Sequence, residues 1–129
     1  LAATRRSGIV TISLRPTTVF EPSDYMKKLP NALNNPTGGI MAYVDARDYA
    51  SAVLLALRDN NIEHDRFFIA ADDALSWDPL SIAFPKMFPG SELVASELTD
   101  TQGPITCAKA KKILGYSPIY SWRQFVQEK

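Results

Sequence analysis

The sequence has too little cysteine, histidine and unbalanced charge for several classes of function. Among its 129 residues it has one cysteine, Cys107, and one histidine, His64. A single cysteine excludes an internal disulfide framework and a multi-cysteine metal site, and a single histidine leaves little room for a histidine zinc site or a Ser/His/Asp relay. Lys and Arg number 14, and Asp and Glu also number 14, so no excess positive charge favours nucleic acid or an anionic membrane. We therefore expect neither a metal site nor a nucleic-acid partner.

Long apolar runs are also missing. The longest, residues 52–57, is far shorter than the roughly 20 residues needed to cross a bilayer. The first residues do not follow the basic-then-apolar pattern of a secretory signal, so we expect no membrane partner and a cytoplasmic location. The composition, 46% hydrophobic and 22% charged, is that of a soluble globular protein, and the length suits one domain.

Short β-branched runs predict strands. The clearest is residues 9–14 (IVTISL), whose continuous apolar character predicts a strand buried on both faces. The next segment, residues 15–23 (RPTTVFEPS), has two prolines and no helical periodicity, so we expect a loop that leaves the end of this strand. Further strands are predicted over residues 40–44 (IMAYV), 66–70 (RFFIA) and 91–94 (SELV).

Helical periodicity is strongest over residues 45–58, where apolar side chains recur at helical spacing. Asp45 is suited to cap the first turn of this helix, and Arg58 lies at its C-terminal end, where a cation is favourable. Strands that alternate with helices in this way favour an α/β fold with parallel strand pairing. Weaker signals predict four more helices, over residues 24–33, 78–88, 107–114 and 122–127. The first is capped by Ser23 or Asp24 and interrupted at Pro30, and the second is weakened by Pro85. The third lies between Thr106 as its cap and Gly115 as its left-handed stop, and the fourth is capped by Ser121.

Three segments carry longer motifs in a fixed order. Residues 10–22 are VTISLRPTTVFEP, residues 43–57 are YVDARDYASAVLLAL, and residues 106–122 are TCAKAKKILGYSPIYSW. Together they resemble the C-terminal part of the extended short-chain dehydrogenase/reductases, the NAD-dependent epimerase/dehydratase family, whose motifs have the forms LRPxxVxGP, VDVRDVAxAxxxAL and SKAxxxLGxxPxxSW. The resemblance covers almost the whole chain. It implies the C-terminal portion of a Rossmann-type doubly wound sheet, with its last strands, and a small α/β substrate lobe.

Two motifs of that family are missing from the sequence. There is no Gly-rich GxxGxxG turn and no Tyr followed four residues later by Lys, the pair that transfers the proton in the family. The resemblance therefore implies that residues 1–129 form a single incomplete domain without the N-terminal cofactor-binding half. It implies no catalytic residue here and no activity of this chain alone. The intact enzyme would use NAD or NADP, and we expect the chain alone to bind neither.

The segment after the first strand carries the expected cofactor contacts. A loop that leaves the carboxyl end of a parallel strand is where ligands bind in open α/β sheets, and proline at position 16 holds the backbone in one direction. The resemblance implies that Pro16, Thr17 and Val19 lie against the nicotinamide. The alternative from the residues alone is that this segment is only a rigid surface loop.

Four residues are candidates for substrate binding: Thr18, Phe20, Tyr25 and Arg47. Nucleotide-sugar enzymes of the family often have Asn where this chain has Thr18, and Glu21 replaces the usual Gly, so both departures count against a standard nucleotide-sugar substrate. The Pro-Thr pair is more like the carbonyl-reductase branch of the family. A guanidinium suits bidentate contact with an anion, so Arg47 could bind a substrate anion or pair with a carboxylate. Phe20 and Tyr25 could equally be core residues.

Two classes of function remain open at this point. The first is a fragment of an NAD- or NADP-dependent epimerase, dehydratase or oxidoreductase, acting on a small molecule with nucleotide sugars among the candidates, and partnered by the missing N-terminal half. The second is a non-catalytic binding or interaction module derived from that family. If the chain is such a fragment, the strand over residues 9–14 would have an unpaired edge, and we expect self-association through it.

Overall fold

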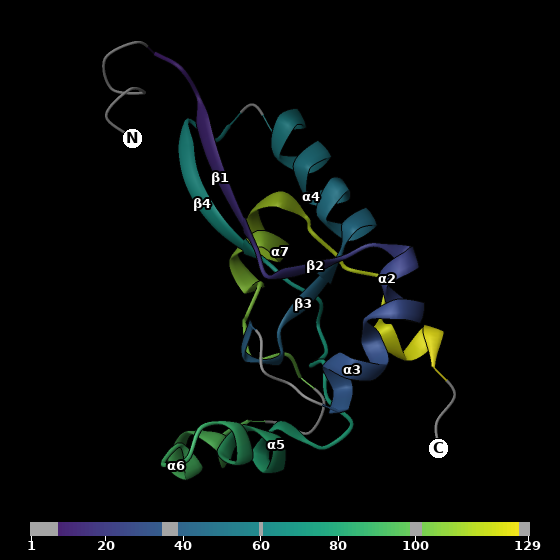
Figure 1. Cartoon of the computed structure of the whole chain (residues 1–129). Helices are drawn as coiled ribbons and strands as arrows, with labels where there is room; N and C mark the ends of the chain where they lie inside the picture. The colour runs from purple at the N-terminus through teal and green to yellow at the C-terminus, as the bar shows by residue number, and fades with distance from the viewer. Residues whose placement is uncertain (1–7, 35–38, 60, 99–101, 127–129) are drawn as a thin grey trace.

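The computed structural model describes residues 8–34, 39–59, 61–98 and 102–126. Its strands form two separate parallel pairs, β1 with β4 and β2 with β3, and helices cover one side of the β1–β4 pair (Figure 1). The strands are β1 (Thr11–Pro16), β2 (Thr18–Phe20), β3 (Tyr43–Asp45) and β4 (His64–Ile69). The helices are α2 (Pro22–Lys27), α3 (Leu29–Asn34), α4 (Ala46–Arg58), α5 (Leu80–Met87), α6 (Glu92–Ala95) and α7 (Ala108–Leu114), with short 3-10 turns η1 (Gly39–Met41) and η2 (Trp122–Phe125).

Strand β1 is covered on one face only, which corrects the prediction of a strand buried on both. Leu14 lies opposite Phe67 in the register, and both pack into a core beneath α4 and α7. The other face, which includes Ser13 and Arg15, is exposed. Sequence alternation cannot tell these cases apart, because Ile12 and Leu14 occupy every second position whether or not a helix covers the side chains between them.

The segment after β1 is a second correction, because the predicted loop over residues 15–23 contains a strand. Pro16 is the last residue of β1, and β2 begins two residues later and pairs with β3. The predicted strand over residues 40–44 starts instead as η1 and becomes β3 only at Tyr43. A three-residue strand is too short to show a period, and its partner is distant in sequence, so tertiary pairing decides both features.

The long helix was predicted correctly. Helix α4 spans Ala46–Arg58, and the Asp45 side chain caps it by accepting from the amide of Arg47. Two other helix ends differ from the expectation. The helix predicted over residues 24–33 is divided into α2 and α3 around Lys28, before Pro30, and its N-cap is Glu21, in a capping box with Asp24. Residues 91–94 contribute to helix α6 rather than to a strand.

The C-terminal segment follows the predicted stops and caps. Helix α7 ends at Leu114, and Gly115 adopts the left-handed conformation (φ 71°) that glycine accommodates without a steric penalty. The start of α7 is the exception: its N-cap is Cys107 and not the predicted Thr106, although the Thr106 hydroxyl accepts from the amide of Ala108 (3.2 Å). Ser121 caps η2 by accepting from the amide of Arg123. The predicted helix over 122–127 is therefore a single 3-10 turn as far as the described residues go.

The buried apolar residues form three neighbouring clusters. One lies between the β1–β4 pair and helices α4 and α7. A second, around Trp122, joins β2, β3, α2 and η2, and a third joins η1 to α5. Figure 1 shows the consequence: α5 and α6 form a lobe at the end of the molecule beyond β3, away from the free ends of β1 and β4.

Candidate functional site

The carboxyl end of β1 brings Pro16, Thr17 and Thr18 to one place. The amide of Thr17 donates to the carbonyl of Ile69 (3.2 Å), which fixes the bend between β1 and β2 to the end of β4. The Thr17 hydroxyl oxygen is buried and has no hydrogen-bond partner. Buried polar groups are nearly always paired, so this unpaired hydroxyl is an unusual feature of the strand end.

An open cavity of about 680 Å³ lies at this strand end, and we call it the Thr17 cavity. Its polar wall is the bend between β1 and β2, and its apolar wall comes from η1, β4, the end of α5 and the segment before α7. None of the described residues that line it is charged. The lining consists of Pro16, Thr17, Thr18, Ile40, Phe68, Met87, Phe88 and Ile105.

The structure thus brings together some of the predicted site residues but not all. Pro16 and Thr17, predicted to contact cofactor, and Thr18, predicted to contact substrate, share the Thr17 cavity. Val19 lies next to them in β2 and is exposed (41%), but it is outside the lining. Ile40, Met87 and Phe88 line the cavity and were missed, because no periodicity or motif marks residues that only the fold brings to a strand end.

The backbone at the apolar wall is strained. Ile40 has φ 51° and Met41 has φ 60°, both in the left-handed region that β-branched and bulky side chains avoid. Such residues cost about 1–3 kcal/mol each and persist only where the surroundings impose them. Met41 is held by burial (1% exposed), whereas the Ile40 side chain is partly exposed (37%) on the cavity wall. Strain of this kind clusters at ligand sites.

Asp45 organises a second group of predicted residues. Its side chain is fully buried and accepts from the Tyr25 hydroxyl (3.0 Å), from the amide of Arg47 (2.8 Å), and from the Arg47 guanidinium at both oxygens (2.9 and 2.8 Å). Burial alone would raise the pKa of Asp45, but the hydrogen bonds from Arg47 and Tyr25 outweigh it and hold the pKa below its ordinary value. The guanidinium also lies 3.5 Å from the ring centroid of Tyr120.

These contacts show what three predicted substrate residues do in the folded chain. Phe20 and Tyr25 are buried (4% and 2% exposed) in the cluster around Trp122, and Tyr25 stacks on Phe125 with ring centroids 4.2 Å apart. The Arg47 side chain is paired with Asp45 but still 39% exposed. None of the three lines the Thr17 cavity, and their role in substrate binding stays a prediction.

Asp48 is a buried carboxylate that the sequence did not single out for this role. It accepts hydrogen bonds from the amides of Ile119 and Tyr120 (3.0–3.2 Å) and so fastens the C-terminal segment to α4. Burial raises the pKa of Asp48, and the two amide donors only partly counter it. A carboxylate in the first turn of a helix is expected to interact favourably with the positive end of the helix dipole. The sequence pattern gives no sign of a hydrogen bond to Ile119, which is 71 residues away.

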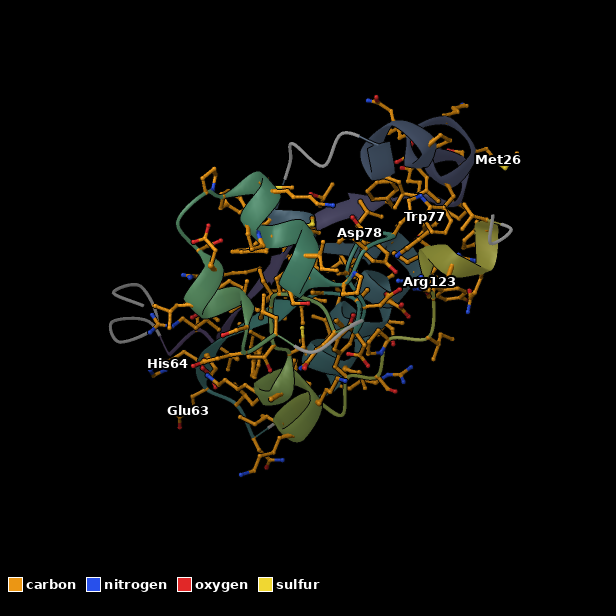
Figure 2. The ribbon with its side chains drawn as sticks, turned by 90° about the horizontal axis from the view of Figure 1, so that it is seen from below. Met26, Glu63, His64, Trp77, Asp78 and Arg123 are labelled. Carbon is orange, nitrogen blue, oxygen red and sulfur yellow. The ribbon has the colours of Figure 1, made fainter. Side chains whose placement is uncertain are left out.

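The remaining reactive side chains take structural places. The Cys107 thiol is buried, accepts from the amide of Ala70 (3.1 Å), and has a pKa raised by burial, which favours the unreactive thiol form. His64 is exposed at the start of β4, and Figure 2 places it at the opposite end of the molecule from Trp77 and Arg123. Across the described ranges, no group of three or more His, Cys, Asp or Glu is placed to hold a metal ion. Nor is any helix there long and apolar enough to span a membrane.

Comparisons with known proteins bear on the fold alone. No protein-family model matches the sequence, and no curated protein matches it. Among solved structures, the chain is similar to UDP-N-acetylglucosamine 4-epimerase from Bacillus cereus, with a TM-score of 0.56 and 18% sequence identity. The match covers 93% of this chain and 43% of the epimerase chain, so this chain spans less than half the length of that protein. The chain therefore has an α/β fold that matches part of a Rossmann-type epimerase, as the sequence predicted.

Proposed function

We propose that this chain is the substrate-side part of an NAD- or NADP-dependent epimerase, dehydratase or reductase. The observation that carries the proposal is the Thr17 cavity, an uncharged hollow at the carboxyl end of a parallel strand that Pro16, Thr17 and Thr18 line. Ligands of open α/β folds bind at this end of the strands. The fold similarity to an epimerase is consistent with this proposal, and so is the resemblance of the three sequence motifs.

The residues present fit one end of a nicotinamide cofactor. Pro16 and Thr17 would lie against the ring at the end of β1, and Val19, exposed next to them in β2, would contact it from outside the cavity lining. Neither a Gly-rich turn nor a cation lies in the described lining to hold a pyrophosphate, so that end must be held by another part of the enzyme. When bound, the cofactor supplies or accepts a hydride; this chain contributes position and shape, and no catalytic acid or base.

Thr18 and Arg47 are the proposed substrate contacts that remain open to a ligand. Thr18 is exposed beside Thr17, so its hydroxyl can donate to or accept from a substrate oxygen. Arg47 would present the exposed part of its guanidinium while Asp45 holds the remainder. Phe20 and Tyr25 would act behind them, because their packing fixes β2 and the Asp45–Arg47 pair.

Two measurements test the proposal: dinucleotide binding by this chain, and the DNA sequence of the coding region upstream of the codon for Leu1. We expect isothermal titration calorimetry of this chain with NAD and with NADP to give no saturable heat, because the phosphate-binding turn is not in the sequence. We also expect an in-frame GxxGxxG turn and a Tyr-xxx-Lys motif upstream of the codon for Leu1. Micromolar binding of either dinucleotide by this chain, or an initiator codon directly ahead of Leu1, would contradict the proposal.

A second candidate function is favoured by one observation. The described residues that line the Thr17 cavity include no titratable side chain, which suits a module that binds a small molecule without acting on it. An initiator codon directly ahead of Leu1, with a ligand bound in the cavity, is the result that would support this module over the enzyme fragment.

We also propose that the free edge of β1 mediates self-association with a second copy. The amides of Thr11 and Thr17 point toward β4, so the alternation of β1 directs the amides of Ile12 and Leu14 to the other edge. Val10 directly precedes β1, and a second copy that lengthens the strand would bring its amide to that same edge. Within the described residues that edge pairs with no strand. Ile9 and Val10 beside it are more than half exposed, and the zero net charge of the chain gives little repulsion between copies.

The edge is tested with a proline that removes one outward donor. We expect the wild type to sediment as a dimer or larger at high concentration, and Val10→Pro to shift it toward the monomer, because proline has no N–H to offer a neighbouring strand. The matched control is Val10→Ala, which shortens the same exposed side chain and keeps the donor. A wild type that stays monomeric at all concentrations, or equal effects of the two variants, would exclude this mode of association.

A further inference from the structure

We propose that the apolar wall of the Thr17 cavity takes an uncharged, apolar substrate group beside the nicotinamide, and that no diphosphate group binds within this cavity. This inference rests on the proposed function and names its substrate class. It stands on three features of the cavity: the chemistry of its wall, the absence of a phosphate-binding group in the described lining, and the strained position of Ile40.

The wall offers exposed apolar surface from segments far apart in the sequence. Phe68 of β4 is 52% exposed, and Phe88 at the end of α5 and Ile40 of η1 are each 37% exposed. All three line the same cavity. Burying such surface against an apolar ligand gains about 25 cal/mol per Å². Cavities lined mainly by apolar and aromatic side chains with few polar groups are the usual form of a small-molecule site.

The described lining offers neither a cation nor a helix N-terminus to bind a diphosphate. Phosphates in proteins are held by Arg or Lys side chains or by helix N-termini. The helix that reaches the cavity, α5, reaches it through its C-terminal residues Met87 and Phe88, and a helix C-terminus carries a partial negative charge that repels anions. The preceding lysine, Lys86, pairs with Asp78 at 2.8 Å.

Arg15 is a cation that contacts one of the lining residues, Phe68. Its guanidinium carbon lies 6.0 Å from the ring centroid of Phe68, which also lines the Thr17 cavity. Arg15 itself lines two other hollows, together with Arg66 and Lys109, and not this one. Phe68 therefore presents an apolar ring to the cavity while the cation beside it belongs to the open, basic face of the β1–β4 pair.

Ile40 keeps an apolar side chain in the cavity wall although its backbone conformation is strained. A left-handed φ of 51° is disfavoured for a β-branched residue, and Asn or Gly would relieve the strain. An isoleucine there presents its side chain to the cavity, where it is only partly buried. Apolar contact with a ligand gives this residue a use that the packing of the free chain does not.

The experiment measures binding of an uncharged fluorophore, N-phenyl-1-naphthylamine, whose emission rises in apolar surroundings. We expect saturable binding to the wild-type chain at one site, with no displacement by uridine diphosphate at millimolar concentration. We expect Phe88→Ala and Ile40→Asn to weaken binding about tenfold each, because each removes apolar wall. Ile40→Asn should also leave the melting temperature nearly unchanged, since relief of backbone strain offsets the lost contact.

The matched control is Leu93→Ala, which removes a more exposed apolar side chain (87%) outside the cavity lining and should leave the affinity unchanged. Displacement of the fluorophore by uridine diphosphate, non-saturable binding, or equal loss in Leu93→Ala and Phe88→Ala would overturn the inference. This outcome is separable from failure of the proposed function. The fluorophore reports on the cavity of this chain without any cofactor, whereas the coding region and dinucleotide titration report on the enzyme.

Discussion

Replacing Asp45 with alanine is expected to lower the free energy of unfolding by about 3 kcal/mol, through loss of a helix cap and an unpaired buried hydroxyl. The Asp45 side chain is the N-cap of α4. It also accepts a hydrogen bond from the buried Tyr25 hydroxyl (3.0 Å). Arg47 loses its partner too, but its partly exposed guanidinium can turn to water. Urea unfolding followed by circular dichroism measures the difference.

The effect of Asp45 should depend on pH in a defined direction. Its pKa is lower in the folded chain than its ordinary value, so its stabilising effect is present above the pKa of the unfolded chain, about 3.9, and is lost as the pH falls through the folded pKa. We therefore expect the difference between wild type and Asp45→Ala to be constant near neutral pH and to shrink below about pH 4. A difference that stays the same down to pH 2 would contradict this assignment.

The control for Asp45 is a carboxylate whose ion pair is exposed. Asp78 pairs with Lys86 at 2.8 Å, and both side chains are more than half exposed. Exposed pairs contribute about 0–1 kcal/mol, so Asp78→Ala should change the stability little. A loss for Asp78→Ala as large as that for Asp45→Ala would mean that general charge, and not the buried network, accounts for the effect.

Trp122→Ala is expected to lower the free energy of unfolding by about 4 kcal/mol, which is more than we expect for Asp45→Ala. This value lies in the range seen when buried aromatic residues are replaced by alanine. Trp122 is fully buried, and its ring nitrogen donates to the carbonyl of Ala74 (2.8 Å) while its amide donates to the Tyr43 hydroxyl (2.9 Å). It joins the C-terminal segment to β3. A loss of this size is a large part of the total stability of about 5–15 kcal/mol typical of small domains.

Trp77 is the matched control for Trp122. The two rings meet edge to face with centroids 4.8 Å apart, but Trp77 is 40% exposed and lies at the surface beside Arg123 (Figure 2). We expect Trp77→Ala to cost much less than Trp122→Ala, with urea midpoints as the readout. A third variant, Trp122→Phe, keeps a ring and loses the bond to Ala74, and should fall between them. Equal costs for the two alanine variants would show that burial of Trp122 is not what secures the C-terminal segment.

Local signals in the sequence were sufficient where the structure depends on neighbouring residues. Helix α4 follows from apolar spacing, with Asp45 as its cap, and the end of α7 follows from Gly115. Each feature involves residues within a turn or two of one another, so spacing and residue type determine it. The α/β class follows for the same reason, from the alternation of such segments.

Features that depend on distant residues were not predictable in this way. Strand β2 exists because it pairs with β3, and α6 forms where the residue types suggested a strand. Two carboxylates at one helix start diverge most: Asp45 and Asp48 are three residues apart, yet Asp45 accepts from Tyr25 and Asp48 accepts from the amides of Ile119 and Tyr120. Only the folded chain distinguishes their roles, and with them the opposite directions of their pKa shifts.

By itself the sequence determined the α/β class, the helix with the clearest period, and the position of the Pro16–Thr18 segment at a strand end. The tertiary structure decided what surrounds that segment. Ile40, Phe68 and Phe88 reach the Thr17 cavity from η1, β4 and α5, and it is their apolar side chains that give the cavity its character. The physical reason is that hydrogen-bond periodicity and capping act over a few residues, whereas the walls of a cavity are set by packing between segments that no local pattern relates.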